Sequence, residues 1–269
     1  MNRSYRLVLL GMSVVSLFFA LGFFLQVPWV VRLWPLESGR LSNIFLSSIL
    51  AAIGAPILWI ALSGETRAAA GGAINLALSS IGFAGMAFLL YFRDPRPGLL
   101  LLGLFALALL VFCIGLIFFS ARFMINDTRP TPGLVRFSFA AFSLMLLAVG
   151  AALVLGRPNI LPWPVSPENS VFYGWIFLGA MCYFLYGLIF PVWGNARGQL
   201  LGFLAYDLIL IGPFLLHFNA VRPEARTSLV VYTLILVYSG LVAVYFLFIH
   251  RATRFNLRRS PGVQVPTRA

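Results

Sequence analysis

Asp207 has the residue type and position best suited to chemistry, because it is the only carboxylic acid inside a long apolar segment of the chain. It follows Gln199 by eight positions, or about 12 Å along a helix that rises about 1.5 Å per residue. An ionised carboxylate within a bilayer costs about 2.5–3.5 kcal/mol. We therefore expect Asp207 to face other helices, either as a proton-titrating or ligand-binding group or as a protonated, structural hydrogen-bonding group.

The expected partners of Asp207 are hydroxyl and amide groups on neighbouring apolar segments. They are Tyr206, Tyr183, Tyr186, Asn75, Ser79 and Ser80. In the internal repeat described below, Asn75 corresponds to Ala205, which lies within one helical turn of Asp207. The sequence thus predicts a binding site where two related helices bring polar groups to a similar depth.

Two prolines, Pro56 and Pro213, lie inside apolar segments. Each removes a backbone hydrogen bond and leaves the carbonyl four residues earlier without its donor. Interrupted helices often flank transport sites, so Pro213 joins the candidate site, although a simple helix kink is the alternative interpretation.

Other chemistry has little support in the sequence. Cys113 and Cys182 show no metal-binding spacing and are expected to be small buried residues. His217 and His250 fall at opposite ends of adjacent predicted spans, too far apart to ligate one haem. Catalytic motifs such as G-x-S-x-G and H-E-x-x-H are absent. We therefore predict no metal or cofactor. Whether the protein is an enzyme stays open, and the absence of catalytic motifs weighs against enzymatic activity.

The composition requires a lipid environment. The 269 residues are 61% hydrophobic and 10% charged, whereas soluble proteins carry roughly 25% charged residues. The net charge of +12 comes from arginines scattered through short loops. This distribution favours topology signals and contact with anionic lipid head groups, and it argues against nucleic acid as a partner.

Eight segments are long and apolar enough to cross a bilayer as helices, which need about 20 residues each. They span roughly 5–27, 42–63, 72–92, 98–121, 135–156, 171–192, 199–218 and 228–250. The first segment exceeds the apolar core of a signal peptide, so we expect it to stay as an uncleaved helix. The predicted fold is an all-α, polytopic integral membrane protein.

Several residues within 33–96 recur in the same order about 130 positions later in the chain. Trp34-Pro35 maps onto Trp163-Pro164 at an offset of 129, and Gly64 and Arg67 map onto Gly194 and Arg197 at an offset of 130. We predict two tandem four-helix repeats, 1–125 and 135–250, joined by a linker at 126–134 and followed by a basic cytoplasmic tail at 251–269. An even number of helices per repeat places the pseudo-twofold axis along the membrane normal.

Arginine placement predicts the orientation. With a cytoplasmic N-terminus, twelve of the nineteen arginines lie inside, as the positive-inside rule requires. The seven outside are Arg32, Arg40, Arg93, Arg96, Arg157, Arg222 and Arg226. Both termini are therefore expected in the cytoplasm of a bacterial-type inner membrane. On the outer side, Trp29, Trp34 and Trp163 are expected to anchor the chain at head-group depth.

The two tryptophan-proline loops carry a short resemblance to a known family. Pro35-Leu36-Glu37 ahead of Phe45, and Pro164 with Glu168 ahead of Phe172-Tyr173, resemble the P-x-E-E/D element of membrane-embedded lycopene cyclases. Ser38 replaces the second acid, the second copy reads Pro167-Glu168-Asn169, and the repeats have four helices where the cyclases use three. The resemblance implies an isoprenoid enzyme with Glu37, Glu168 and Asp207 as its acids.

Three functions remain open from the sequence. The first is a small transporter or membrane-embedded binding protein with its site near Asp207, between the repeats. The second is an accessory or scaffold subunit of a larger membrane complex, which would make other membrane subunits its partners. The third is an enzyme acting on a lipid or isoprenoid.

Overall fold

The computed structural model describes residues 3–255 and is all-α. Its long helices are α1 (Arg3–Phe24), α3 (Arg40–Ser63), α4 (Ala69–Arg93), α5 (Pro97–Ser120), α6 (Gly133–Val154), α7 (Pro167–Ile189), α8 (Trp193–His217) and α9 (Arg226–Val244). The short helices are α2 (Pro28–Val31), two 3-10 turns (Thr66–Ala68 and Pro223–Ala225) and a π-helical turn (Tyr245–Ile249) that continues α9. Eight of these helical segments are long and apolar enough to span a membrane. The predicted spans are confirmed, and the chain is a multi-pass integral membrane protein.

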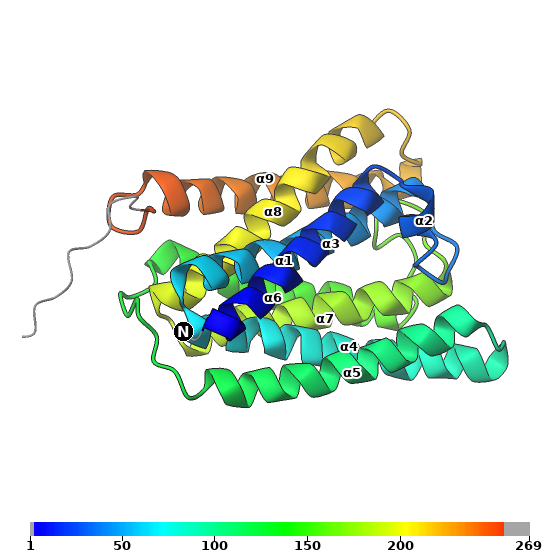
Figure 1. The fold of residues 1–269 in the computed structure, drawn as a ribbon. Helices are drawn as coiled ribbons and strands as arrows, with labels where there is room; N and C mark the ends of the chain where they lie inside the picture. The colour runs from blue at the N-terminus through cyan, green and yellow to red at the C-terminus, as the bar shows by residue number, and fades with distance from the viewer. Residues whose placement is uncertain (1–2, 256–269) are drawn as a thin grey trace, which may run out of the picture.

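The long helices form two rows (Figure 1). In one row α1 packs on α3, α3 on α8 and α8 on α9; in the other α5 packs on α4, α4 on α7 and α7 on α6. Tyr5 of α1 meets Phe119 of α5, with 4.9 Å between ring centroids. Ser138 of α6 and Tyr238 of α9 share a hydrogen bond of 2.8 Å. The rows are therefore joined along both outer edges, and each row contains helices from both halves of the chain.

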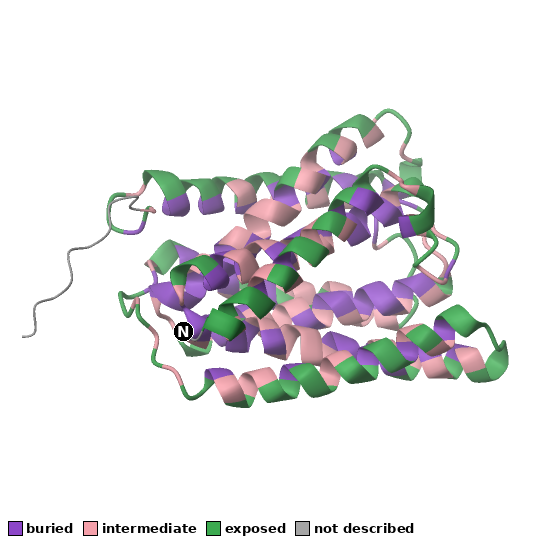
Figure 2. Cartoon of the chain, in the orientation of Figure 1, coloured by how far each residue is buried: buried purple, intermediate pink, exposed green. Residues whose placement is uncertain are grey.

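The outward faces of the helices are exposed and apolar (Figure 2). Helix α5 is the most apolar of the spans and the least buried within the protein. In water such a surface would drive aggregation, whereas hydrocarbon solvates it without cost. Exposure on the outward faces of these helices therefore means contact with lipid.

Both ends of the described chain lie at the same end of the bundle (Figure 1). Tyr5 and Phe255 belong to one hydrophobic cluster, packed around buried residues that include Leu9 and Trp59. Residues 256–269, which hold most of the predicted basic tail, lie outside the described residues.

A polar clasp at this end links the two halves, formed by Glu65, Asn126, Asp127, Arg129 and Arg197. The buried carboxylate of Glu65 accepts the backbone N–H groups of Asn126 and Asp127 at 2.9 and 2.8 Å. The carboxylate of Asp127 pairs with Arg129 at 2.6 Å and with Arg197 at 3.1 Å. Arg129 also donates to the carbonyl of Ala252.

The same segment sets where α8 begins, which is six residues earlier than the sequence predicts. The first helical N–H groups have no partner within a helix. In α8, the Trp193 N–H donates to the carbonyl of Arg129 at 2.7 Å, and the Gly194 N–H donates to that of Asp127 at 2.9 Å. Residues 193–198, which include the polar Asn195 and Arg197, therefore join the helix, and Asp207 lies fourteen residues beyond its start, or about 21 Å along it.

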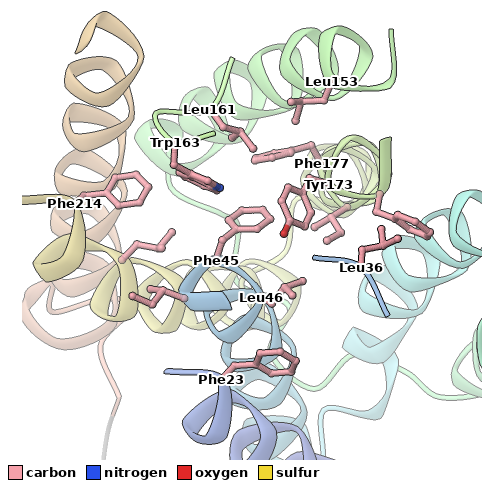
Figure 3. Close-up of a cluster of buried hydrophobic side chains, with 14 of the residues drawn as sticks. Phe23, Leu36, Phe45, Leu46, Leu153, Leu161, Trp163, Tyr173, Phe177 and Phe214 are labelled. Carbon is pink, nitrogen blue, oxygen red and sulfur yellow. The ribbon is translucent and has the colours of Figure 1, made fainter. Parts of the chain in front are cut away.

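The opposite end of the bundle holds an aromatic cluster (Figure 3). The Trp163 indole N–H donates to Ser42 Oγ at 3.0 Å, and the Trp163 ring lies 5.7 Å from that of Phe45. Trp163 thus reaches from the second half of the chain to the first. Trp34 does the reverse, since its indole N–H donates to Asn169 Oδ1 in the second half at 2.8 Å. These contacts fix the ends of α3 and α7 against each other.

The expected membrane anchoring by Trp163 is wrong. Its side chain is only 4% exposed, because Phe45, Phe214 and Ser42 surround it. Trp29 is 53% exposed and does face the surroundings of the protein. The amphipathic indole of Trp163 serves protein packing, with its polar N–H satisfied internally.

Trp163→Ala should lower the melting temperature in mild detergent by on the order of 10 °C, because truncating a buried aromatic side chain costs about 3–5 kcal/mol. Trp29→Ala is the matched control and should change the melting temperature little. Equal effects of the two substitutions would contradict the packing role of Trp163.

The clasp should make stability depend on acid pH. Burial alone would raise the pKa of the Asp127 carboxyl, but the hydrogen bond and charge of Arg129, with the charge of Arg197, hold this pKa below its ordinary value. A group with a lowered folded-state pKa contributes stability above its unfolded pKa of about 3.9 and loses that contribution as the pH falls through the folded value.

Asp127→Asn should therefore lower the melting temperature at pH 7 by about 2–4 °C, equivalent to about 1 kcal/mol for a partly exposed pair. The difference from wild type should stay constant down to about pH 4 and shrink below it. Asp94→Asn is the control, since Asp94 pairs with Arg96 while 65% exposed. A difference that grows as the pH falls below 4 would refute the assigned sign.

Candidate binding cavity

A cavity of about 1010 Å³ lies between the two rows of helices. Its walls come from helices α3 to α9, from Phe23 at the end of α1 and from connecting segments, and they are mostly leucine, isoleucine, phenylalanine and alanine side chains. Ligand sites in proteins typically occupy about 300–1,000 Å³. The volume is therefore enough for a molecule of lipid-like size.

The cavity exists because the rows are held together at their edges and ends while the side chains between them leave space. Small residues keep the middle open, among them Ala52 of α3 and Ala180 of α7. Helices α3 and α8 meet closely there, since a Cβ added to Gly202 would lie 3.1 Å from the Ala52 carbonyl. That carbonyl is the one that Pro56 deprives of its helical donor.

Several wall residues of the cavity also face outward. Leu101 and Phe105 of α5 are 67% and 65% exposed, and Val231 of α9 is 49% exposed. These side chains therefore form part of the cavity wall and also have exposed surface. The polar residues Arg32 and Glu224, in the loops at the aromatic end, also belong to the wall.

Asp207 lies in the cavity wall on α8 and is 5% exposed. It points towards α9, where Gly240 leaves it room: a Cβ added to Gly240 would lie 3.5 Å from Asp207 Oδ2. Within residues 3–255 neither carboxyl oxygen has a hydrogen-bond partner of normal geometry. Ser239 interacts with the carboxyl group, but its Oγ already donates to the Ile235 carbonyl at 2.8 Å.

Further buried polar atoms line the same wall without a partner of normal geometry in the described part of the chain. They are the hydroxyl oxygens of Tyr206 and Tyr232 and the Oε1 atom of Gln199. The two tyrosines interact with each other across the α8–α9 contact, and Gln199 uses its Nε2 to donate to the Tyr183 carbonyl. Buried polar groups are normally satisfied, so these atoms are exceptions within a mostly apolar wall.

The structure brings most of the sequence-predicted site residues to this cavity. Its wall includes Asn75, Ser79, Tyr183 and Tyr206 together with Asp207. Ser79 Oγ donates to the Trp175 carbonyl at 3.2 Å, so its hydroxyl is already engaged in joining α4 to α7.

Two predicted site residues lie outside the wall. Tyr186 is buried against Phe190, with 4.9 Å between ring centroids, and its side chain also lies beside Gly71. Pro213 lies six residues beyond Asp207 on α8, which continues as a helix through it. Neither belongs to the residues that border the cavity.

Sequence reasoning missed Gln199, Tyr232 and Ser239. Tyr232 and Ser239 are seven positions apart on α9 and so share one helix face. That spacing within an otherwise apolar segment was the available signal. Which face of α9 meets α8 is a matter of tertiary packing, which periodicity does not report.

Catalytic carboxylates do not gather here. Of the acids implied by the cyclase resemblance, Glu37 is exposed and Glu168 half-buried, and neither lines the cavity with Asp207. Within residues 3–255, no three His, Cys, Asp or Glu side chains come close enough to hold a metal ion. The arrangement offers hydrogen bonding, proton exchange at one carboxyl and a large apolar volume.

No family model, no curated protein and no solved structure matches this chain.

Replacing Asp207 by leucine should raise the melting temperature, because an unsatisfied buried polar group costs about 1–3 kcal/mol. Such a gain in stability is expected when a residue is kept for function at the expense of stability. Ser79→Ala is the control and should not stabilise, since it removes a satisfied hydrogen bond. A lower melting temperature for Asp207→Leu would show instead that the carboxyl holds helices together.

Proposed function

We propose that the chain is a membrane-embedded binding or transport protein for a lipophilic molecule, held in the cavity with its polar end at Asp207. One observation carries the proposal: a cavity of about 1010 Å³ with apolar walls reaches a buried carboxyl group that has no hydrogen-bond partner of normal geometry among the described residues. Intramembrane carboxyl groups are costly and usually functional. The ligand would supply both the apolar bulk and the missing partner.

The position of the cavity among membrane-spanning helices supports a ligand drawn from the bilayer. Leu101, Phe105 and Val231 line the cavity and also have exposed surface. A lipophilic molecule that has partitioned into hydrocarbon reaches the site without passing through water, so only its polar end needs new interactions.

The proposed site lies between two tandem four-helix repeats, and helix packing supports this duplication. If α1, α3, α4 and α5 correspond to α6, α7, α8 and α9, then the contact of α1 with α3 corresponds to that of α6 with α7. The contact of α3 with α8 likewise corresponds to that of α7 with α4. This exchange of partners is what a twofold axis along the membrane normal produces.

The tryptophan contacts support the same symmetry at the level of side chains. Trp34 in the first half contacts Asn169 and Phe172 in the second half. Trp163 in the second half contacts Ser42 and Phe45 in the first half. In each case the indole hydrogen bond and the ring contact fall three positions apart at the start of a helix.

The orientation we propose has both termini in the cytoplasm of a bacterial-type inner membrane. It rests on the arginine distribution, with twelve of nineteen on that side including those of the tail at 251–269. In this orientation the clasp is cytoplasmic, while Arg32 and Glu224 at the mouth of the cavity lie on the outer side.

The other two functions have weaker support. A pure scaffold subunit has no need of a large cavity ending at an unpaired carboxyl group. The isoprenoid enzyme would require several acids at one site, but Glu37 and Glu168 lie apart from the cavity that holds Asp207. The binding or transport function is therefore the one we pursue.

The test is to purify the protein in mild detergent and identify extracted lipophilic molecules by mass spectrometry. Wild type should retain one species at about one molecule per chain, enriched over bulk lipid. Ala180→Phe, which fills the cavity, should lose it, whereas Ala108→Phe on the exposed face of α5 should keep it. If wild type and Ala180→Phe retain the same molecules in the same amounts, the proposal is wrong.

A further inference from the structure

The polar atoms around Asp207 are unusually rich in free acceptors. Both Asp207 oxygens lack partners of normal geometry among the described residues. The hydroxyls of Tyr206 and Tyr232, which interact with each other on the same wall, can rotate and also accept. A matching ligand group must therefore donate several hydrogen bonds.

The charged side chains of the cavity wall also disfavour a negatively charged ligand group. The wall contains two carboxylic acids, Asp207 and Glu224, and one arginine, Arg32, which lies in the loop beyond α2. No basic side chain of residues 3–255 forms an ion pair with Asp207, since the ion pairs found there involve Asp94 and Asp127. A carboxylate or phosphate head group would meet only like charge beside Asp207.

Taking these observations together, we infer that the polar end of the ligand is a protonated amine, so that the cavity takes a lipophilic amine. A primary ammonium has three donors, enough for both Asp207 oxygens and one neighbouring acceptor. An alcohol has one donor and leaves the other acceptors unsatisfied. The ammonium and the carboxylate neutralise each other, which offsets the cost of burying either charge alone.

This inference rests on the proposed function and narrows it to one class of ligand. The test compares three probes with the same chain and different head groups: dodecylamine, dodecanol and dodecanoate. Each is titrated into the purified full-length protein in a neutral detergent below the micelle-forming concentration of the probe, and binding is followed by thermal shift.

We expect dodecylamine to bind at least about tenfold more tightly than dodecanol, equivalent to about 1.4 kcal/mol, and dodecanoate to bind least. Asp207→Asn should bring the amine down to the affinity of the alcohol while leaving the alcohol within about threefold of its wild-type value. Asp94→Asn, which makes the same change at an exposed carboxylate outside the cavity, should keep the wild-type ranking. Circular dichroism of Asp207→Asn checks that its helices are intact, and the ranking in wild type tests the inference without any variant.

Two outcomes overturn the inference in different ways. Equal binding of amine and alcohol to wild type, lost in Ala180→Phe, would refute the amine while leaving the cavity as a lipophile site. Absence of saturable binding by all three probes would overturn the amine inference together with the proposed function.

Discussion

The main physical constraint on this structure is the burial of one carboxyl group, that of Asp207, in an apolar surrounding. Asp207 is 5% exposed and its oxygens are unsatisfied among the described residues, which is costly in any protein interior. Other interactions must hold α8 in place against this cost. The clasp fixes its first turn through Asp127 and Arg197, and Trp163 packs on Phe214 near its other end. Gly240 then leaves the carboxyl room beside α9.

The two-row arrangement explains how a chain with no soluble domain makes an internal volume. Each half contributes helices to both rows, so neither half encloses the cavity alone. In lipid, helices gain little from hydrophobic association and rely on close packing and hydrogen bonds. The α1–α3 contact illustrates this, since Ser13 and Ser16 donate to the carbonyls of Gly54 and Leu50 at 2.9 and 2.7 Å. Strong contacts within the rows permit looser packing between them.

The buried polar groups fall into two sets, one at the clasp and one at the cavity, and the two sets differ in their partners. At the clasp, Glu65 and Asp127 are paired with backbone N–H groups and arginines, so their charges contribute to structure. In the cavity, Asp207, Tyr206 and Tyr232 line an open volume and have no such partners among residues 3–255. The contrast between satisfied and unsatisfied carboxyl groups in one chain is what directs attention to the cavity.

The sequence by itself determined the class of protein, because spans of about 20 apolar residues leave only membrane-crossing helices as a stable solution. It also identified Asp207, since a lone acid in an apolar segment is visible without coordinates. It misassigned Trp163 as a membrane anchor, because indole burial depends on which helix lies opposite. Tyr232 and Ser239 on α9 line the cavity only through tertiary packing, which turns their face towards α8. Tyr186 and Pro213 were left outside the cavity for the same reason. Local pattern determines which segments are helices, but the exact ends, rotation and neighbours of each helix follow from contacts between distant segments.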